Sequence, residues 1–392
     1  MKQEILSILS DVIAIPSVAL QSNLKLVEYI ENYLLKLGGD IHLIHNYKND
    51  KASLVCFLGP RDVEGGLILS GHMDTVPPDV SKWNTDPFGL VEGVSPEGEV
   101  GYFGLGVCDM KTFLAQTLFC VRELDQKKLK RPLVLMFTYD EEVGCMGVRS
   151  ALSFIKSLSR TIPSSAMIGE PTGLKVFTAH KGHTQLTISV RGKAGHSSRV
   201  DEGVNAIEWA CRVISVINDY GIELREKVKF QDLFKDYPFR TLNVAQIQGG
   251  SAVNIIPEDC EIKVGYRTLP GDNPDTIYQE LKHRVEEEVL SCLHQKHPAA
   301  DILFKLENEV MAMHTPEGSE IEKNLREVVN DYDIHAAPYT TEGGIISHFG
   351  VDCIICGSGS IKNAHQSNEF MSKEDIFKGI DVIKAIIERM CF

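Results

Sequence analysis

The sequence lacks the features that mark membrane-spanning, nucleic-acid-binding and disulfide-stabilised proteins. No apolar run in its 392 residues reaches the ~18 residues that a membrane span requires. The formal net charge of −14 leaves no basic excess for a nucleic-acid backbone, so we expect neither a membrane nor a nucleic acid as partner. The ten cysteines show no disulfide-like spacing, which favours a reducing compartment and predicts a cytoplasmic protein.

Other absences narrow the chemistry. The motifs H-E-x-x-H, G-x-S-x-G and Walker A are missing, as are internal repeats and low-complexity segments. The N-terminus predicts an amphipathic helix and not a signal peptide, because Glu4 and Asp11 interrupt its apolar residues. The C-x-x-C pair Cys353 and Cys356 lies in the apolar run VDCIICG. Without a second pair for a zinc ribbon, we expect buried core thiols there.

Two kinds of hydrophobic pattern divide the chain. Up to about residue 180, short continuous apolar runs such as GGLILSG and PLVLMFTY suit parallel strands buried on both faces. TQLTISVRG and EIKVGYR instead alternate apolar and polar residues, as half-exposed antiparallel strands do. We therefore predict an α/β catalytic domain over 1–182 and 296–392, with an inserted α+β domain over 183–295. The sheet of the catalytic domain should be mixed, mostly parallel and flanked by helices.

Metal-ligand residue types cluster at the predicted strand ends, where sites assemble in open α/β sheets. Imidazoles together with several carboxylates suit divalent ions such as zinc. Taken singly, each has a plainer explanation, such as a helix cap or a turn, but their joint appearance at strand ends favours a metal site. The residues are His72 and Asp74 in LILSGHMDTVP, Asp109 in GLGVCDMK, Glu141 and Glu142 in FTYDEEVG, Glu170 in SAMIGEPTG, and His365 in GSGSIKNAHQSNEF.

Spacing gives two of these groups a specific chemical interpretation. On an extended chain His72 and Asp74 face the same way, so the carboxylate could hold the second ring nitrogen of the histidine. Adjacent side chains at a strand end point in different directions. One of Glu141 and Glu142 could therefore bind a metal while the other acts as general base. A solvated loop would also tolerate the three acids 140–142.

A series of extended blocks resembles a known enzyme family. SGHMDTVP, GLGVCDMKTFLAQ, DEEVGCMG, GEPTGL, GKAGHSS, GGSAVNIIP and CGSGSIKNAHQSNEF occur in the order found in the dinuclear-zinc amidohydrolases. That family contains deacetylases, desuccinylases, aminoacylases and carboxypeptidases. The resemblance implies a zinc-exopeptidase-like catalytic domain, an inserted dimerisation or lid domain, and two divalent ions per chain, zinc or cobalt.

The resemblance also implies roles for individual residues. His72 and Glu170 would share one ion, Glu142 and His365 the other, and Asp109 would bridge the two. Glu141 would be the general base, and Asp74 the acid behind the first histidine.

Three residues of the inserted domain carry further implied roles. By the same resemblance, His196 would stabilise the oxyanion, in many members across a dimer interface, and Asn254 and Arg267 would hold the substrate carboxylate. From the residues alone, His196 could equally belong to a structural loop, and Arg267 to a solvated strand face.

The implied reaction is hydrolysis of an N-acyl amino acid, with N2-acetyl-L-ornithine as the expected substrate and a homodimer as the expected assembly. The alternatives are N-succinyl-diaminopimelate, another acyl-amino acid, or a catalytically silent binding protein. A succinylated substrate requires an extra cationic group, which the sequence does not locate. A silent member would have lost a ligand or the base, yet all five ligand positions and Glu141 are present. Ser358 and Ser367 stand where proline is expected, and TTEGG (340–344) departs from the usual substrate loop.

Overall fold

The computed structural model describes residues 2–158 and 161–392, and the chain divides into two compact units. The first unit comprises Met1–Ala179, Met313–Ala336 and Thr341–Phe392. The second comprises His180–Ala312 and Ala337–Thr340. Along the chain, the second unit lies between β8 (Phe177–His180) and β15 (Met313–His314), so it is an insertion into the first.

The second unit extends further along the chain than the predicted insertion over 183–295. Strand β14 (Asp301–Val310) pairs antiparallel with β9 (His183–Arg191), so it belongs to the inserted sheet and not to the catalytic part. The pattern of β14 conceals this, because most of its side chains are exposed or half-buried and a register shift lies between Leu306 and Asn308.

A mixed sheet flanked by helices forms the centre of the first unit, as predicted. In the described residues its strand order is β1-β2-β6-β3-β7-β17-β8-β15, and β16 pairs with β8. The central strands β6, β3, β7 and β17 run parallel, whereas the β1–β2 and β2–β6 pairs are antiparallel. The strands are β1 (Asp40–His45), β2 (Ala52–Leu58), β3 (Leu67–His72), β6 (Leu133–Thr138), β7 (Ser165–Pro171), β8 (Phe177–His180), β15 (Met313–His314), β16 (His335–Ala337) and β17 (Asp352–Gly357).

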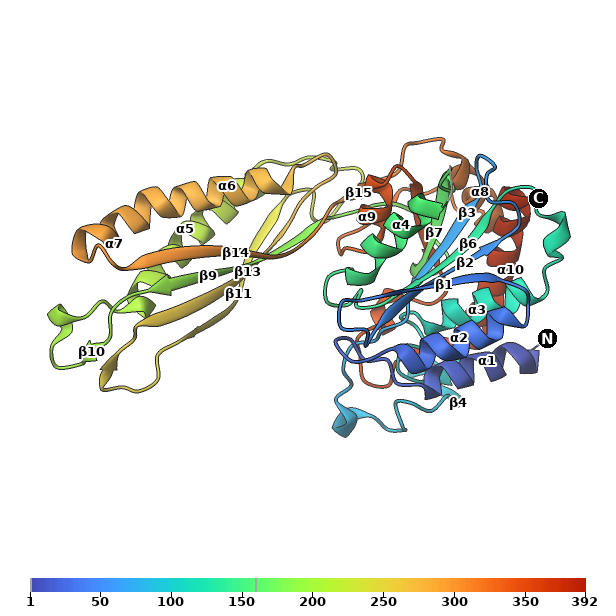
Figure 1. The fold of residues 1–392 in the computed structure, drawn as a ribbon, viewed down its shortest axis with the longest axis horizontal. Helices are drawn as coiled ribbons and strands as arrows, with labels where there is room; N and C mark the ends of the chain where they lie inside the picture. The colour runs from blue at the N-terminus through green and yellow to red at the C-terminus, as the bar shows by residue number, and fades with distance from the viewer. Residues whose placement is uncertain (1, 159–160) are drawn as a thin grey trace. The chain divides into compact units, whose positions relative to one another are not determined.

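Helices cover both faces of this sheet (Figure 1). The helices α2, α3, α8 and α10 pack on one face, α1 packs on α3, and α4 and α9 lie on the other face. The helices are α1 (Lys2–Ala14), α2 (Leu24–Leu35), α3 (Lys111–Arg122), α4 (Met146–Leu158), α8 (Glu320–Val329), α9 (Gly343–His348) and α10 (Lys373–Cys391). A small antiparallel sheet joins β18 (Phe370–Ser372), β5 (Val100–Phe103) and β4 (Val91–Val94).

Burial explains why the apolar runs become central strands. Every residue of β2, β3, β6 and β7 is buried, because helices on both sides exclude water from these strands. Cys353 and Cys356 are buried free thiols of β17, as predicted. Helix α10 begins after Ser372, whose Oγ accepts a hydrogen bond from the backbone N–H of Asp375 at 3.0 Å.

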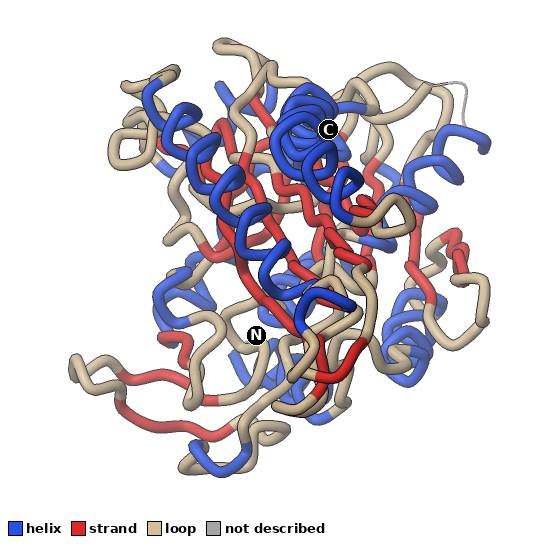
Figure 2. The backbone as a smooth tube through the Cα atoms, turned by 90° about the vertical axis from the view of Figure 1, so that its left-hand side faces the viewer, coloured by secondary structure: helices blue, strands red, loops and turns tan. Residues whose placement is uncertain are grey.

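The second unit is an antiparallel sheet with helices on one face (Figure 2, helices blue and strands red). Its strand order is β11-β13-β9-β14, and the β9 residues Leu186, Ile188 and Val190 are buried while Gln185 is exposed. This alternation matches the predicted half-exposed strands. The remaining elements are β10 (Gly195–His196), α5 (Ala206–Glu226), β11 (Thr241–Gly249), β12 (Ile255–Ile256), β13 (Asp259–Arg267), α6 (Pro274–Val285) and α7 (Ser291–Lys296).

Helix length and hydropathy bear on membrane insertion. Over the described residues, no helix combines the length and apolar character that crossing a membrane requires.

Candidate metal centre and active site

The topology of the first unit gathers the predicted ligands at one edge of the sheet. Strands β6, β3 and β7 are parallel neighbours, so their carboxyl ends meet. His72 ends β3, Glu170 lies near the end of β7, and Glu141 and Glu142 follow β6. Asp109 precedes α3 and reaches the same edge, because its carboxylate contacts His72.

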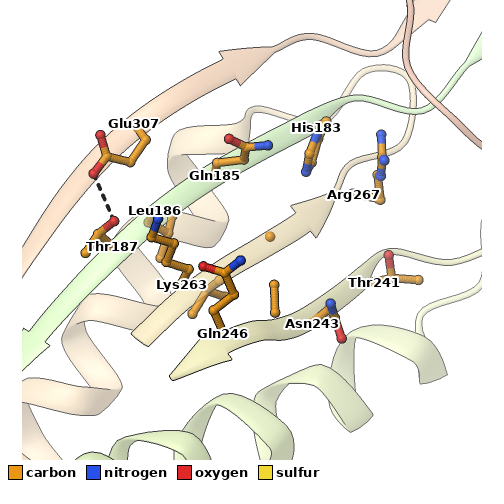
Figure 3. Close-up of a pocket in the computed structure, with 13 residues that line it drawn as sticks. His183, Gln185, Leu186, Thr187, Thr241, Asn243, Gln246, Lys263, Arg267 and Glu307 are labelled. Atoms are coloured by element: carbon orange, nitrogen blue, oxygen red, sulfur yellow. Dashed lines mark hydrogen bonds between the residues drawn. The ribbon is translucent and has the colours of Figure 1, made fainter. Parts of the chain in front are cut away.

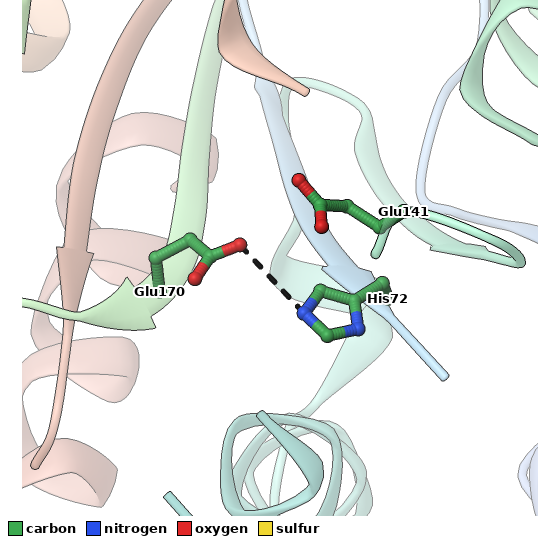
Figure 4. Close-up of side chains that lie close together, drawn as sticks. All are labelled: His72, Glu141 and Glu170. Carbon is green, nitrogen blue, oxygen red and sulfur yellow. Dashed lines mark ion pairs between the residues drawn. The ribbon is translucent and has the colours of Figure 1, made fainter. Parts of the chain in front are cut away.

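His72 is a buried imidazole with carboxylates on one side. Its Nε2 lies 3.0 Å from Asp109 Oδ1 and 3.7 Å from Glu170 Oε1. Figure 4 shows the carboxyl groups of Glu141 and Glu170 near this ring, with Glu170 beside its Nε2. One oxygen or nitrogen from each of His72, Glu141 and Glu170 falls within a 4.8 Å cluster. The cluster is compact enough for one ion.

The second ring nitrogen of His72 has a different partner from the one expected. His72 Nδ1 lies 2.9 Å from the backbone carbonyl of Asp74 and 3.7 Å from its carboxylate. The Asp74 carboxylate instead accepts hydrogen bonds from the backbone N–H groups of Glu141 and Glu142, each at 3.1 Å. The carbonyl acceptor still orients the ring with Nε2 toward the acids, while the Asp74 side chain holds the loop of the two glutamates.

Asp109 joins both halves of the cluster. Its Oδ1 faces His72, and its Oδ2 lies 3.3 Å from Nε2 of His365. His365 Nε2 also lies 3.0 Å from the carboxylate of Glu142. One carboxylate between two imidazoles is the arrangement that a bridging ligand needs.

The donor chemistry fits divalent cations. Burial raises the pKa values of Glu141 and Glu170 well above the usual range, against the lowering effect of His72, and neighbouring carboxylates add to the rise. In the described part of the chain, neither lysine nor arginine forms an ion pair with Asp109, Glu142 or Glu170. A buried acidic cluster of this kind requires compensating positive charge, which bound divalent ions would supply.

The two adjacent glutamates diverge, as their position at a strand end predicts. Glu142 points to His365, whereas Glu141 lies with His72 and Glu170. Beside Glu141, the Sγ of Cys145 is 3.5 Å from its carboxylate.

The sequence reasoning assigned no role to three further buried carboxylates at this site. Glu342 accepts hydrogen bonds from Ser70 Oγ, at 3.1 Å, and from Thr138 Oγ1. Glu369 accepts three backbone N–H groups, from Gly106, Cys108 and Asp109, at 2.7, 2.7 and 2.8 Å. The third is Asp140, which pairs with Lys51. The signal available for Glu342 was its place in the atypical TTEGG segment. Glu369 lies in the block CGSGSIKNAHQSNEF, which carries the family resemblance, whereas Lys51 stands in an ordinary polar context.

The two serines at expected proline positions lie near the site. Ser358 is buried, and its Oγ accepts a hydrogen bond from Gln116 Nε2 of α3 at 2.9 Å. This bond ties the end of β17 to α3. Nothing in the structure explains the serine at 367.

His196, Asn254 and Arg267 all lie in the second unit. His196 is exposed in β10, with its Nδ1 2.8 Å from Ser198 Oγ. Asn254 lies beside it, because its carbonyl accepts the N–H of Ser197 at 3.1 Å. Arg267 ends β13, and its guanidinium donates to Thr340 Oγ1 at 2.6 Å. Burial lowers the pKa of Arg267.

A cavity of about 690 Å³ lies on the sheet of the second unit, and Arg267 lines it (Figure 3). Lys263, four positions before Arg267 on the same face of β13, and His183 of β9 also line it. The cavity therefore contains more cationic than anionic side chains, since its one acidic residue is Glu307.

The fold and the cluster of imidazoles and carboxylates define a metal-dependent amidohydrolase. Residues 68–389 match the model of peptidase family M20/M25/M40, and the chain belongs to that family.

Relatives and solved structures agree with this assignment. Acetylornithine deacetylase from Pasteurella multocida (strain Pm70) is 33% identical over 372 residues, covering 95% of this chain and 92% of the relative. An M20 family metallo-carboxypeptidase from Sulfolobus solfataricus matches with a TM-score of 0.78 at 18% identity, over 98% of both chains. A dinuclear metal-binding peptidase of the M20 family from Bacillus subtilis matches with a TM-score of 0.68 at 14% identity, over 98% of this chain and 97% of the other. These two structural matches establish the shared fold.

Proposed function

We propose that the protein removes the acetyl group from N2-acetyl-L-ornithine, yielding L-ornithine and acetate for arginine biosynthesis. The observation that carries the proposal is the donor set at the carboxyl edge of the sheet. In it Glu141 lies near His72 and Glu170, and no lysine or arginine of residues 2–158 and 161–392 pairs with it. The substrate follows from the acetylornithine deacetylase of P. multocida, which aligns over nearly the whole chain.

Two divalent ions, zinc or cobalt, fit this donor set. His72 and Glu170 would hold one, Glu142 and His365 the other, and Asp109 would lie between them. When bound, such ions polarise the amide carbonyl and acidify water. The protein contributes a rigid frame, because Asp74 holds the Glu141–Glu142 backbone and Glu369 holds that of Asp109.

Glu141 acts as the general acid–base group in this proposal. Its carboxylate takes a proton from the attacking water as the oxygen adds to the acetyl carbon. The same carboxyl group then returns that proton to the ornithine nitrogen as the C–N bond breaks. Glu141 suits this role because no cation pairs with it among the described residues and its neighbour Glu142 is turned to His365.

Geometry within the second unit supports a homodimer. Asn254 precedes β13 and Arg267 ends it, and the eight residue steps from Asp259 to Arg267 span about 27 Å in a strand. This separation favours placing the two side chains at different active sites. We therefore propose that His196 and Asn254 serve the partner's active site, while Arg267 serves its own.

Exposed apolar side chains give the second unit a surface for this assembly. Edge strand β11 has Ile247 at 49% exposure, and nearby on the chain Val253 and Ile255 are exposed as well. An edge strand with exposed apolar residues favours pairing with another chain.

We propose the cytoplasm as the location. The ten cysteines are free thiols in the described structure, as a reducing compartment allows.

A second candidate is desuccinylation of N-succinyl-diaminopimelate or hydrolysis of another acyl-amino acid. Lys263 and Arg267 line the same cavity and supply the additional cation that a second carboxylate requires. A silent binding role is disfavoured, because the proposed base and every proposed ligand are present.

The test is kcat/KM of the metal-loaded protein on N2-acetyl-L-ornithine and N-succinyl-diaminopimelate side by side. We expect a preference of about 100-fold or more for the acetyl substrate, equivalent to ~2.7 kcal/mol of transition-state binding. The reverse preference would favour the second candidate. If the Lys263→Ala variant then lost only succinyl turnover, the cavity would be the reason.

A further inference from the structure

The segment from Ser17 to Asn23, which we call the N-terminal strap, connects α1 to α2 and lies along the His72 loop. Ser17 Oγ donates to the carbonyl of Met73 at 2.6 Å, and the N–H of Thr75 donates to the carbonyl of Ser17 at 3.1 Å. The N–H of Ala19 donates to the carbonyl of Thr75 at 2.9 Å. The strap is therefore fixed to the residues that immediately follow the first histidine ligand.

The same strap is bonded to the loop that carries the adjacent glutamates. Asp140, the first of the three consecutive acids, is buried and has a φ of +53°. Its Oδ1 accepts the backbone N–H of Leu20 at 2.9 Å, and its Oδ2 pairs with Lys51 Nζ. With both oxygens so engaged, Asp140 does not join the cluster of candidate ligands.

Lys51 is held in place from the other side. Its ammonium is buried, and among the described residues Asp140 is the carboxylate that pairs with it. The next residue, Ala52, exchanges two hydrogen bonds with the side chain of Asn23, at 2.9 and 3.0 Å. Lys51 therefore sits at the junction of β2 and the strap.

The backbone of Glu141 and Glu142 is thus held at two points. At one point, the Asp74 carboxylate accepts the backbone N–H groups of both glutamates. At the other, the preceding residue, Asp140, is bonded to Lys51 and Leu20. The positive φ of Asp140 turns the chain sharply out of β6, so the direction of the two glutamates depends on this anchor.

We propose that Lys51 and Asp140 are positioning residues that, through the strap, fix Glu141 and Glu142 relative to His72. The inference rests on the roles proposed for those three residues. These roles account for the three consecutive acids. Asp140 anchors the loop and is neutralised by the buried Lys51, while Glu141 and Glu142 serve as the proposed base and ligand.

Loss of one partner would release the loop. With Lys51 removed, Asp140 becomes a buried carboxylate without a cation, directly before two further carboxylates. The chain can lower that energy only by turning Asp140 toward water or toward the metal site. Either movement displaces Glu141 and Glu142.

The experiment compares Lys51→Met, Asp140→Asn, the double variant and Lys51→Arg by kcat, KM, bound metal and the visible absorption spectrum of the cobalt-loaded protein. We expect Lys51→Met to lower kcat about 10–100-fold, as loss of a ligand-orienting partner does, with little change in KM. The cobalt spectrum should shift, because Glu142 is displaced. Lys51→Arg should restore most of kcat, and the double variant should be no worse than Lys51→Met.

A matched ion pair in the same unit provides the control. Buried Glu322 and half-buried Arg326 of α8 form an ion pair at 2.9 Å. The further side-chain contacts of this pair are with Gly318, Asp331 and Asp333. Arg326→Met should lower the melting temperature while leaving kcat and the cobalt spectrum unchanged.

A parental kcat and spectrum in Lys51→Met would overturn the proposal. If that variant does not fold, the same result in Asp140→Asn, which retains an acceptor for Leu20, would overturn it. Failure of the general-base assignment is recognised separately, because the cobalt spectrum and metal content do not depend on the role of Glu141.

Discussion

Each buried carboxylate around the candidate metal centre has its own set of partners, and those partners determine what it can do. Asp140 is paired with a lysine, Glu369 accepts three backbone N–H groups, and Glu342 accepts two hydroxyls. Asp109 and Glu142 face imidazoles instead. The first three carboxylates have their hydrogen bonds and charge satisfied within the protein. Asp109 and Glu142 remain candidates for metal binding.

Glu369→Gln should weaken metal binding. A glutamine amide presents N–H donors toward three backbone donors, so at least one of them loses its acceptor and the Asp109 loop shifts. We expect the affinity for the ions to fall about 10–100-fold, measured by competition with a chelator. Glu322→Gln, which alters a buried carboxylate in α8, should leave metal affinity unchanged. Equal affinities in the two variants would contradict the role of Glu369.

A buried histidine of the second unit predicts acid sensitivity. Burial lowers the pKa of His180 to about 4, so the unfolded chain, with a pKa near 6.5, takes up this proton first as the pH falls. The stabilising contribution of the neutral ring is complete above about pH 6.5 and is lost as the pH falls toward 4. It amounts to roughly 3 kcal/mol.

Urea titrations between pH 7 and 4 measure this effect. The His180→Asn variant should lose stability less steeply than the parent over this range, whereas a substitution at the exposed His294 should leave the slope as it is. Parallel pH curves for His180→Asn and the parent would refute the prediction.

At the residue scale, the sequence indicated the candidate ligands but not the residues that hold them in place. His72, Glu142 and Glu170 could be selected because their residue types coincide with strand ends. Asp109 stood just before a predicted helix, and His365 was the candidate of ligand type near the C-terminus. Glu342 and Glu369 could not, because a buried carboxylate is recognised by partners that are distant in sequence, such as Ser70 for Glu342. The same holds for Lys51, whose burial depends on Asp140, 89 positions away.

Among the elements, α10 shows how local sequence specifies structure. Ser372 caps its first turn, and Ile376, Ile380, Ile383 and Ile387 are buried on one stripe, so its start and face were predictable. Strand β14 was not, because an edge strand with many exposed side chains lacks a strict period of two. Its assignment required the pairing with β9.

Removal of the α10 cap should have a modest, measurable cost. Ser372→Ala deletes the acceptor of the Asp375 N–H and should lower the free energy of unfolding by about 1 kcal/mol. Urea denaturation measures the loss. Ser372→Thr keeps the hydroxyl and should recover most of it, so an alanine variant as stable as the parent would argue against the cap.

At the scale of the whole molecule, the proposed dimer depends on one edge of the inserted sheet. Ile247→Lys places a charge on the exposed edge strand β11 and should yield a monomer. Activity should be lost with dimerisation, because His196 and Asn254 would no longer reach the partner, while metal content stays at two ions per chain.

The opposite edge offers the control for that prediction. Leu303→Lys changes β14, whose side chain at this position is 39% exposed, and should leave both mass and activity unchanged. Light scattering during gel filtration gives the mass. A fully active monomeric Ile247→Lys protein would show that each chain is self-sufficient.

The most direct test of the account substitutes the two adjacent glutamates separately and measures metal content and kcat in parallel. Glu141→Gln should retain two ions per chain and lose about 10²–10⁴-fold in kcat, since it removes the general base. Glu142→Gln should lose an ion, since it removes a ligand. Near-normal turnover in Glu141→Gln, or loss of an ion from that variant, would contradict the division of labour on which the proposed function rests.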